Sequence, residues 1–353
     1  MDRIRLGRTG LMVSRSGFGA IPIQRLDKDR STSLLRKAYE GGINFFDTAH
    51  GYTDSEEKIG LALADVRSSI VIATKTPASD PKGVLENLEL SLSRLRTDYI
   101  DIYQFHNPRT VPWPGDGTGM YEALLEARSK GLIRFIGMTN HRQPVAREAL
   151  ESGLYDTLQF PFSSLSSDTD RDLLGLAREK DVGFIAMKGL AGGLITNARA
   201  AFAFMRSTEY AVPIWGMQRE SELEEFLALE RDPPALDQAM WKIIEKDRAE
   251  LAGSFCRGCG YCLPCPAGIE TNTAARISLL MTRSRFEPYV TPEWREKMER
   301  IDGCTHCGHC RDNCPYGLDT PELLKEQLAW YRGFVKDRGL AGSGNIPRRH
   351  SRQ

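Results

Sequence analysis

The sequence predicts an α/β fold, a (β/α)8 TIM barrel, followed by a small C-terminal module that binds metal. Two observations support this division. From residue 13 to residue 230, short β-rich apolar runs alternate with amphipathic segments of helical length, a pattern typical of a parallel sheet with helical crossovers. All eight cysteines lie between Cys256 and Cys314, and the 255 residues before them contain none.

The alternating pattern gives eight strand candidates, enough to favour closure into a barrel over an open sheet. The predicted strands are Ser16–Ala20, Asn44–Asp47, Ile70–Lys75, Tyr99–Phe105, Arg134–Thr139, Thr157–Phe160, Gly183–Met187 and Val212–Met217. Helical periodicity covers Ser31–Glu40, Ser55–Ala64, Gly83–Arg94, Gly119–Lys130, Gln143–Ser152 and Asp170–Lys180. Before them, Ile4–Val13 predicts an N-terminal β-hairpin that closes the bottom of the barrel.

The domain boundary is expected at the proline-rich break Arg231-Asp232-Pro233-Pro234. We therefore predict a barrel over residues 1–235, a helical, cysteine-rich module over 236–340 and a disordered tail over 341–353. The module contains helical patterns at Gln238–Ala252, Asn272–Met281 and Pro321–Tyr331.

Composition excludes several classes of partner. The 47 basic residues cancel the 47 acidic ones, which argues against nucleic acid and anionic lipid. No apolar run reaches the roughly 18 residues of a membrane span. The first residues, Met1 to Arg5, lack the apolar core of a secretory signal, so a cytoplasmic location is expected. Cysteines confined to one region indicate a metal module rather than a disulfide framework.

Polar residues stand at the predicted C-terminal ends of the strands, where a barrel of this kind carries its chemistry. These residues are Asp47, Lys75, His106, Asn140, Gln159 and Lys188. Helix capping favours Ser or Asp and gives no preference for Lys or His. The set is therefore interpreted as an active-site rim.

The segments around these positions resemble the aldo-keto reductase family over about 220 residues. The signature is Phe45-Phe46-Asp47-Thr48-Ala49-His50-Gly51-Tyr52 followed by Ser55-Glu56; related segments are Leu6–Leu11, Ile72–Lys75, Gln104–His106, Gly137–Asn140 and Met187–Gly193, in the family's order. The resemblance implies a catalytic tetrad of Asp47, Tyr52, Lys75 and His106. It also implies a small carbonyl or alcohol substrate.

These residue types suit carbonyl reduction, which needs a hydride on carbon and a proton on oxygen. A free tyrosine has a pKa of about 10, too high for efficient proton exchange near neutrality. An ammonium at Lys75 beside Tyr52 favours the phenolate, and Asp47 keeps the lysine charged. His106 is expected to hydrogen-bond the carbonyl oxygen.

The resemblance also implies a nicotinamide cofactor across the rim. The implied contacts are Gly19, Thr139, Asn140, Gln159, Phe162, Lys188, Gly216 and Met217. Many family members grip a 2′-phosphate with Lys-Ser and a later Arg near the last strand. Here the turn continues into Glu220 and Glu222, and Arg219 is the local cation. Both NADP(H) and NAD(H) therefore remain open.

The cysteine spacing indicates two [4Fe–4S] clusters. The groups read Cys256-x2-Cys259-x2-Cys262-x2-Cys265-Pro266 and Cys304-x2-Cys307-x2-Cys310-x3-Cys314-Pro315. In bacterial ferredoxins the fourth cysteine of each group binds the other cluster. That rule gives one set of Cys256, Cys259, Cys262 and Cys314, and another of Cys304, Cys307, Cys310 and Cys265. Two structural zinc sites are the alternative, although zinc ribbons usually separate their Cys pairs by longer stretches.

Two functions follow from the two halves. The first is a carbonyl reductase or alcohol dehydrogenase accompanied by iron–sulfur electron transfer. Because nicotinamide passes a hydride pair and each cluster passes single electrons, direct exchange between them is not expected. Either a flavin mediates, or the clusters serve a redox protein partner or another substrate step, or they are structural. The second is an iron–sulfur electron-transfer protein whose barrel serves as a docking or sensing scaffold.

Overall fold

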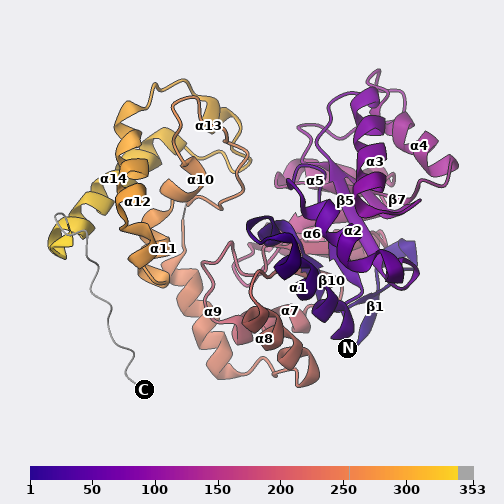
Figure 1. Ribbon diagram of the computed structural model, residues 1–353, viewed down its shortest axis with the longest axis horizontal. Coiled ribbons are helices and arrows are strands. Elements are labelled where there is room, and N and C mark those ends of the chain that lie inside the picture. The colour runs from indigo at the N-terminus through magenta and orange to yellow at the C-terminus, as the bar shows by residue number, and fades with distance from the viewer. Residues whose placement is uncertain (254, 341–353) are drawn as a thin grey trace. The chain divides into compact units, whose positions relative to one another are not determined.

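The computed structural model describes residues 1–253 and 255–340, and it divides into two compact units (Figure 1). The first contains Met1–Leu190 and Asn197–Arg248. The second contains Ala191–Thr196 and the described residues between Ala249 and Leu340. The helix that follows the proline-rich break thus groups with the first unit, because Met240 and Ile244 are buried in that unit's core. The predicted tail lies outside the described residues.

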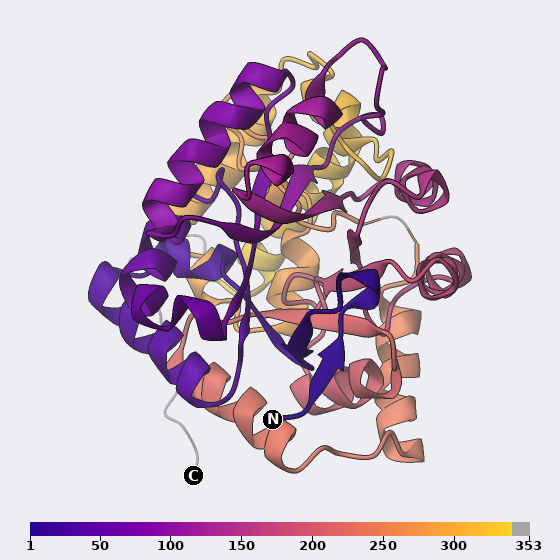
Figure 2. The ribbon, with the colours of Figure 1, turned by 90° about the vertical axis from the view of Figure 1, so that its right-hand side faces the viewer.

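The first unit is a closed barrel of parallel strands, as the sequence predicts (Figure 2). Its strands follow the order β10-β3-β4-β5-β6-β7-β8-β9, and β10 pairs with both β9 and β3. Their bounds are β3 Gly17–Gly19, β4 Phe45–Asp47, β5 Val71–Thr76, β6 Ile100–His106, β7 Ile133–Thr139, β8 Thr157–Pro161, β9 Gly183–Met187 and β10 Ala211–Gly216. Nearly every strand residue is buried, as expected when helices cover a parallel sheet.

Helices connect the strands and bury one face each. Their bounds are α1 Lys28–Glu40, α2 Ser55–Leu63, α3 Pro81–Leu95, α4 Met120–Ser129, α5 Gln143–Ser152, α6 Asp168–Glu179, α7 Ala198–Ser207, α8 Glu220–Arg231 and α9 Gln238–Glu250, with 3-10 turns η1 Gly7–Thr9, η2 Ile21–Arg25 and η3 Ala64–Ser69. Several begin at a side-chain cap. The Asp27 carboxylate accepts a hydrogen bond from the Arg30 amide, and Ser167 accepts one from Asp170, so backbone donors at these helix starts are satisfied.

The N-terminal hairpin closes one end of the barrel. Its strands β1 Arg3–Arg5 and β2 Met12–Ser14 pair antiparallel (Figure 2). Leu6 and Leu11 pack with inward-facing strand residues such as Phe45. Gly7 has a φ of +50°, and a Cβ there would lie 2.2 Å from the Gly183 nitrogen, so only glycine fits. The polar residues at the C-terminal ends of the strands lie at the opposite end of the barrel.

The second unit is helical. Its elements are α10 Thr271–Ala274, α11 Ile277–Arg283, η4 Glu287–Tyr289, α12 Pro292–Glu299, η5 Arg300–Gly303, α13 His309–Asp312 and α14 Thr320–Asp337. The single helix expected at Asn272–Met281 is instead two, because Arg276 lies between them with a φ of −141°. Residues of α14, including Leu324 and Leu328, form a small core with Ile277 and Met298. No helix among the described residues has the length and apolar content to cross a membrane.

Candidate active site and cysteine centres

Strand register brings the predicted rim residues side by side. Lys75 on β5 pairs with Gln104 on β6. His106 at the end of β6 pairs with Thr139 on β7, and Thr139 pairs with Gln159 on β8. Because parallel strands end on the same edge of the barrel, these side chains meet at one rim.

The four predicted catalytic residues converge at this rim. The Lys75 ammonium donates to both carboxylate oxygens of Asp47, at 2.7 and 2.8 Å, and to the Thr48 carbonyl at 2.6 Å. Its Nζ also lies 5.4 Å from the centre of the Tyr52 ring. The Tyr52 and His106 rings meet edge-on with their centres 5.7 Å apart. The side chains of Tyr52, Lys75 and His106 therefore lie close together at the rim.

Burial sets the electrostatics of the rim. It lowers the pKa of Lys75 and raises the pKa of Asp47, while the direct contact between the two opposes both shifts. Burial, with a smaller contribution from Lys75, lowers the pKa of His106 to about 3. His106 is therefore a neutral imidazole at physiological pH and can donate or accept a hydrogen bond without adding a second positive charge.

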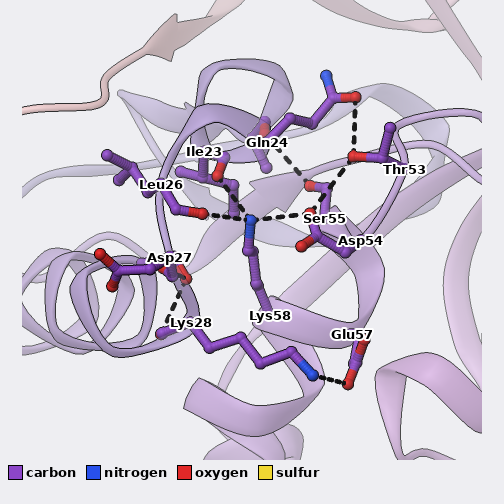
Figure 3. A network of polar contacts seen from close by, with 12 residues as sticks. Ile23, Gln24, Leu26, Asp27, Lys28, Thr53, Asp54, Ser55, Glu57 and Lys58 are labelled. Atoms are coloured by element: carbon purple, nitrogen blue, oxygen red, sulfur yellow. Dashed lines mark hydrogen bonds and ion pairs between the residues drawn. The ribbon is translucent and has the colours of Figure 1, made fainter.

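A second buried lysine fixes the turn that carries Tyr52 (Figure 3). The Lys58 ammonium donates to the carbonyls of Ile23 and Leu26, at 3.0 and 2.7 Å, and pairs with Asp54 at 2.8 Å. The neighbouring Ser55 hydroxyl donates to the Ala20 carbonyl at 3.2 Å. These contacts tie the loop after β3 to the start of α2, immediately after Tyr52.

Side-chain amides form a chain along the rim. Gln104 donates to the Gln159 side-chain oxygen at 3.0 Å, and Thr139 donates to Gln104 at 3.1 Å. Gln159 in turn donates to Asp47 at 3.4 Å. The Asn140 amide already binds backbone, since its nitrogen donates to the Pro108 carbonyl at 2.9 Å.

Two rim residues were missed by sequence reasoning. Gln104 stands two residues before His106 on one strand, and the period-two alternation of a strand is a signal that could have found it. His141 follows Asn140 and is buried, and its pKa is lowered well below the usual value by burial and then by the nearby charges of Lys188 and His106. The sequence offers no separate signal for His141.

Some of the remaining predicted cofactor residues lie at the ends of the strands, and others are buried in the core. Gly19 pairs in register with Asp47, and Gly216 is exposed at the end of β10. Lys188 follows β9 with a φ of +62°. Phe162, in contrast, is 2% exposed and stacks on Phe204 within the core. The expectation that Phe162 contacts the cofactor is therefore wrong, because its side chain lies between the barrel strands and α7 rather than at the rim.

Met217 is the other departure from the predicted cofactor contacts. Its side chain is completely buried in the core of the barrel unit.

The first cysteine group gathers residues from both motifs. Burial raises the pKa of Cys256, and the neighbouring Cys259 and Cys314 add to the rise. Burial likewise raises the pKa of Cys262 to about 11, with further contributions from Cys256 and Cys259. Cys314, which is distant in sequence, therefore lies with the first motif.

The second group lines a small hollow. Its lining includes four thiols, Cys265, Cys304, Cys307 and Cys310. Burial raises the pKa of Cys310, and Cys304 and Cys265 contribute. Four soft sulfur donors around one hollow suit an iron–sulfur cluster. The structure thus places Cys265 with the second motif.

Family comparisons agree with this division. Residues 15–211 match the aldo/keto reductase family, and residues 255–319 match the 4Fe-4S dicluster domain. The first match covers more than half of the chain and includes every tetrad residue. The second contains all eight cysteines.

Individual relatives point the same way. The chain is 30% identical to the NADH-specific methylglyoxal reductase of Escherichia coli over 264 residues, which cover 66% of this chain and 80% of that protein. It is 32% identical to the uncharacterized oxidoreductase YqkF of Bacillus subtilis over 211 residues, covering 56% and 67%. The aldo-keto reductase AKR11C1 of Bacillus halodurans shares the fold, with a TM-score of 0.62, 23% identity and coverage of 70% and 96%. The protein is therefore an oxidoreductase of the aldo/keto reductase family that carries a C-terminal 4Fe-4S dicluster domain.

Proposed function

We propose that the protein interconverts a small carbonyl compound and its alcohol with a nicotinamide cofactor, using Tyr52 as the proton donor and acceptor. The observation that carries this proposal is the convergence of Tyr52, Lys75 and His106, with the lysine held by Asp47. When bound, the cofactor supplies the hydride that reaches the carbonyl carbon.

The residues of the chain then handle the oxygen. The His106 imidazole hydrogen-bonds the carbonyl oxygen and orients it toward Tyr52. As negative charge develops there, the Tyr52 hydroxyl releases its proton to that oxygen, and the resulting phenolate is stabilised by the Lys75 ammonium. Solvent reprotonates the tyrosine. Alcohol oxidation follows the same path in reverse, with the phenolate taking the hydroxyl proton.

Cofactor contacts are proposed for the predicted residues at the rim, of which Thr139, Asn140 and Gln159 are buried. Thr139, Asn140 and Gln159 supply amide and hydroxyl groups for the carboxamide. Gly19 and Gly216 allow close approach, the Met217 backbone lies at the same turn, and Lys188 supplies charge for the phosphates. The residue types therefore fit a dinucleotide.

We propose NAD(H) as the preferred form. Two cations lie next to the adenosine turn after β10. The Arg219 guanidinium donates to Glu222 at 2.8 and 2.5 Å, and Arg25 donates to the Gln218 side-chain oxygen at 3.2 Å. A 2′-phosphate there would meet a neutralised arginine and the carboxylates of Glu220 and Glu222. The E. coli relative is named an NADH-specific enzyme, which supports the same choice.

The cysteines are proposed to hold two [4Fe–4S] clusters with exchanged fourth ligands. Cys256, Cys259, Cys262 and Cys314 form one set, and Cys304, Cys307, Cys310 and Cys265 form the other. Because each cluster passes one electron at a time, we assign them to exchange with a redox protein partner rather than directly with the hydride. Flavin content of the purified protein tests the alternative mediator.

Anaerobic titration with NADH and NADPH, followed by a carbonyl substrate screen, tests the proposal. Tyr52→Phe is expected to lower kcat by about 100- to 10,000-fold while NADH affinity stays unchanged. Tyr210→Phe is the matched control, because its hydroxyl donates to Asp181 at the hairpin end of the barrel. Full activity in Tyr52→Phe, or absence of NADH and NADPH binding in the wild type, would refute the hydride-transfer function.

A further inference from the structure

The loop after β9 is shared between the two units. Lys188, Gly189 and Leu190 belong to the barrel, as does Asn197 at the loop's end. Residues Ala191–Thr196 group with the cysteine unit by their contacts. The loop that begins at the proposed phosphate-binding Lys188 therefore has its middle portion held by the iron–sulfur half of the protein.

The backbone of this loop is unusual. Lys188 and Ala191 have φ values of +62° and +49°, a region that residues with a Cβ rarely adopt. Gly192 and Gly193 follow at +68° and +91°. Such a conformation costs free energy and persists only where the surroundings hold it in place.

Two arginines of the cysteine unit hold this loop by hydrogen bonds to its backbone. Arg276 donates from Nη1 to the Gly192 carbonyl at 3.1 Å. Arg283 donates from Nε to the Leu194 carbonyl at 2.7 Å, and its other end pairs with Glu250. The Leu194 side chain between them is completely buried. The loop is thus fixed through its carbonyls by charged donors.

Arg276 also contacts the first cysteine motif. A Cβ at Gly258 would lie 2.5 Å from its guanidinium carbon, so the guanidinium packs directly on that glycine. Its Nε donates to the Asn272 carbonyl at 3.2 Å, and the Cys256 sulfur approaches the same carbonyl at 3.7 Å. One guanidinium therefore contacts both the cysteine motif and the loop.

We propose that Arg276 and Arg283 are positioning residues for the cofactor site. By holding the loop that starts at Lys188, they set its conformation for the dinucleotide phosphates, and Arg276 makes that conformation depend on the first cysteine centre. The inference rests on the proposed cofactor site. It gives the fused iron–sulfur unit a role in nucleotide affinity that requires no electron transfer between cluster and nicotinamide.

The test uses the intact, cluster-loaded protein and anaerobic NADH titration by fluorescence. Arg276→Ala is expected to raise the Kd for NADH about tenfold, equivalent to about 1.4 kcal/mol. Arg283→Ala is expected to raise it about fivefold, because one charged donor is lost. Arg295→Ala is the matched control: it removes a similar bond, to the Val290 carbonyl at 3.1 Å, in the same unit. Its Kd should change by less than about twofold.

Electron paramagnetic resonance of the reduced protein separates positioning from general destabilisation. Arg276→Ala should alter one cluster signal, whereas Arg283→Ala should leave both unchanged and still weaken NADH binding. Unchanged NADH affinity in Arg283→Ala with full iron content overturns the inference, even where Arg276→Ala fails to retain iron. Equal affinities in all variants overturn this inference alone, whereas a wild type that binds neither NADH nor NADPH overturns the proposed function itself.

Discussion

The barrel rim and the cysteine centres differ in how their buried charged groups are stabilised. At the rim, the protein itself compensates each buried charge, since Lys75 contacts Asp47 and a carbonyl directly. At the centres, the thiols lie together and burial raises the pKa of Cys256, Cys262 and Cys310. Several thiolates in one place repel one another unless a cation compensates them. The charges at the rim are thus compensated by the protein alone, whereas the stability of the cysteine unit depends on the metal that its sulfurs bind.

Cluster removal is expected to produce the largest difference in stability between the barrel and the cysteine unit. Stripping iron anaerobically should raise amide hydrogen exchange across α11 and α14 by at least about 100-fold, because a core this small depends on its metal. Exchange in β6 and β7 should stay unchanged. Mass spectrometry of peptides from each unit measures both. Equal protection of α14 with and without iron would show that the unit folds on its own core and would end the contrast.

The next largest effect is expected from breaking the rim's ion pair. Lys75→Met leaves the Asp47 carboxylate buried without its partner and should cost about 3–5 kcal/mol of barrel stability. Lys28→Met is the control: Lys28 pairs with Glu57 at 2.6 Å, but both are exposed, so the loss should not exceed about 1 kcal/mol. Exchange-derived opening free energies of β5 report the difference. Similar losses in the two variants would mean that the Asp47 pair adds no special stability.

The fold was largely predictable because its signals are periodic. Helices and strands alternate over the barrel region, and seven of the eight predicted strands differ from the observed ones by only one or two residues, as with Ile70–Lys75 against Val71–Thr76. The remaining strand, Gly183–Met187, matches the observed β9 in full. The cysteine unit was harder, because its chain path follows its ligands more than any periodicity. The break at Arg276 illustrates this: that residue leaves helical geometry while its side chain reaches the Gly192 carbonyl.

The candidate site was predictable where a strand end determines the direction of a side chain. Asp47, Lys75 and His106 are of this kind, and register brings them together. Phe162 was misjudged because it follows its strand, where orientation depends on tertiary packing. The partners of Lys58 could not be read from sequence either, since it binds carbonyls contributed by backbone more than thirty residues away.

Lys58 shows that a buried charge of the barrel can also hold backbone in place. Lys58→Met removes the ammonium that the Ile23 and Leu26 carbonyls and Asp54 share, and it should lower the local stability of the loop after β3 by about 2 kcal/mol. Because that loop is bonded to the turn carrying Tyr52, kcat should fall with the iron content unchanged. Lys28→Met again serves as control, since its exposed pair with Glu57 joins α1 to the same helix, α2 (Figure 3). Unaltered exchange in residues 20–26 would contradict this role for Lys58.

Barrel stability is also expected to depend on pH. His106 has a pKa lowered to about 3, and that of His141 is well below normal, in both cases chiefly through burial. In the unfolded chain, histidine binds a proton below about pH 6.5. The unfolded state therefore holds more protons below that pH, and barrel stability should fall as pH drops from about 6.5, by up to about 1.4 kcal/mol per pH unit for each histidine. His141→Gln should reduce this slope. Urea unfolding of the barrel between pH 7 and pH 5 measures it. An identical slope in His141→Gln would mean that His141 is protonated in the folded rim, and that the rim does tolerate a further positive charge beside Lys188.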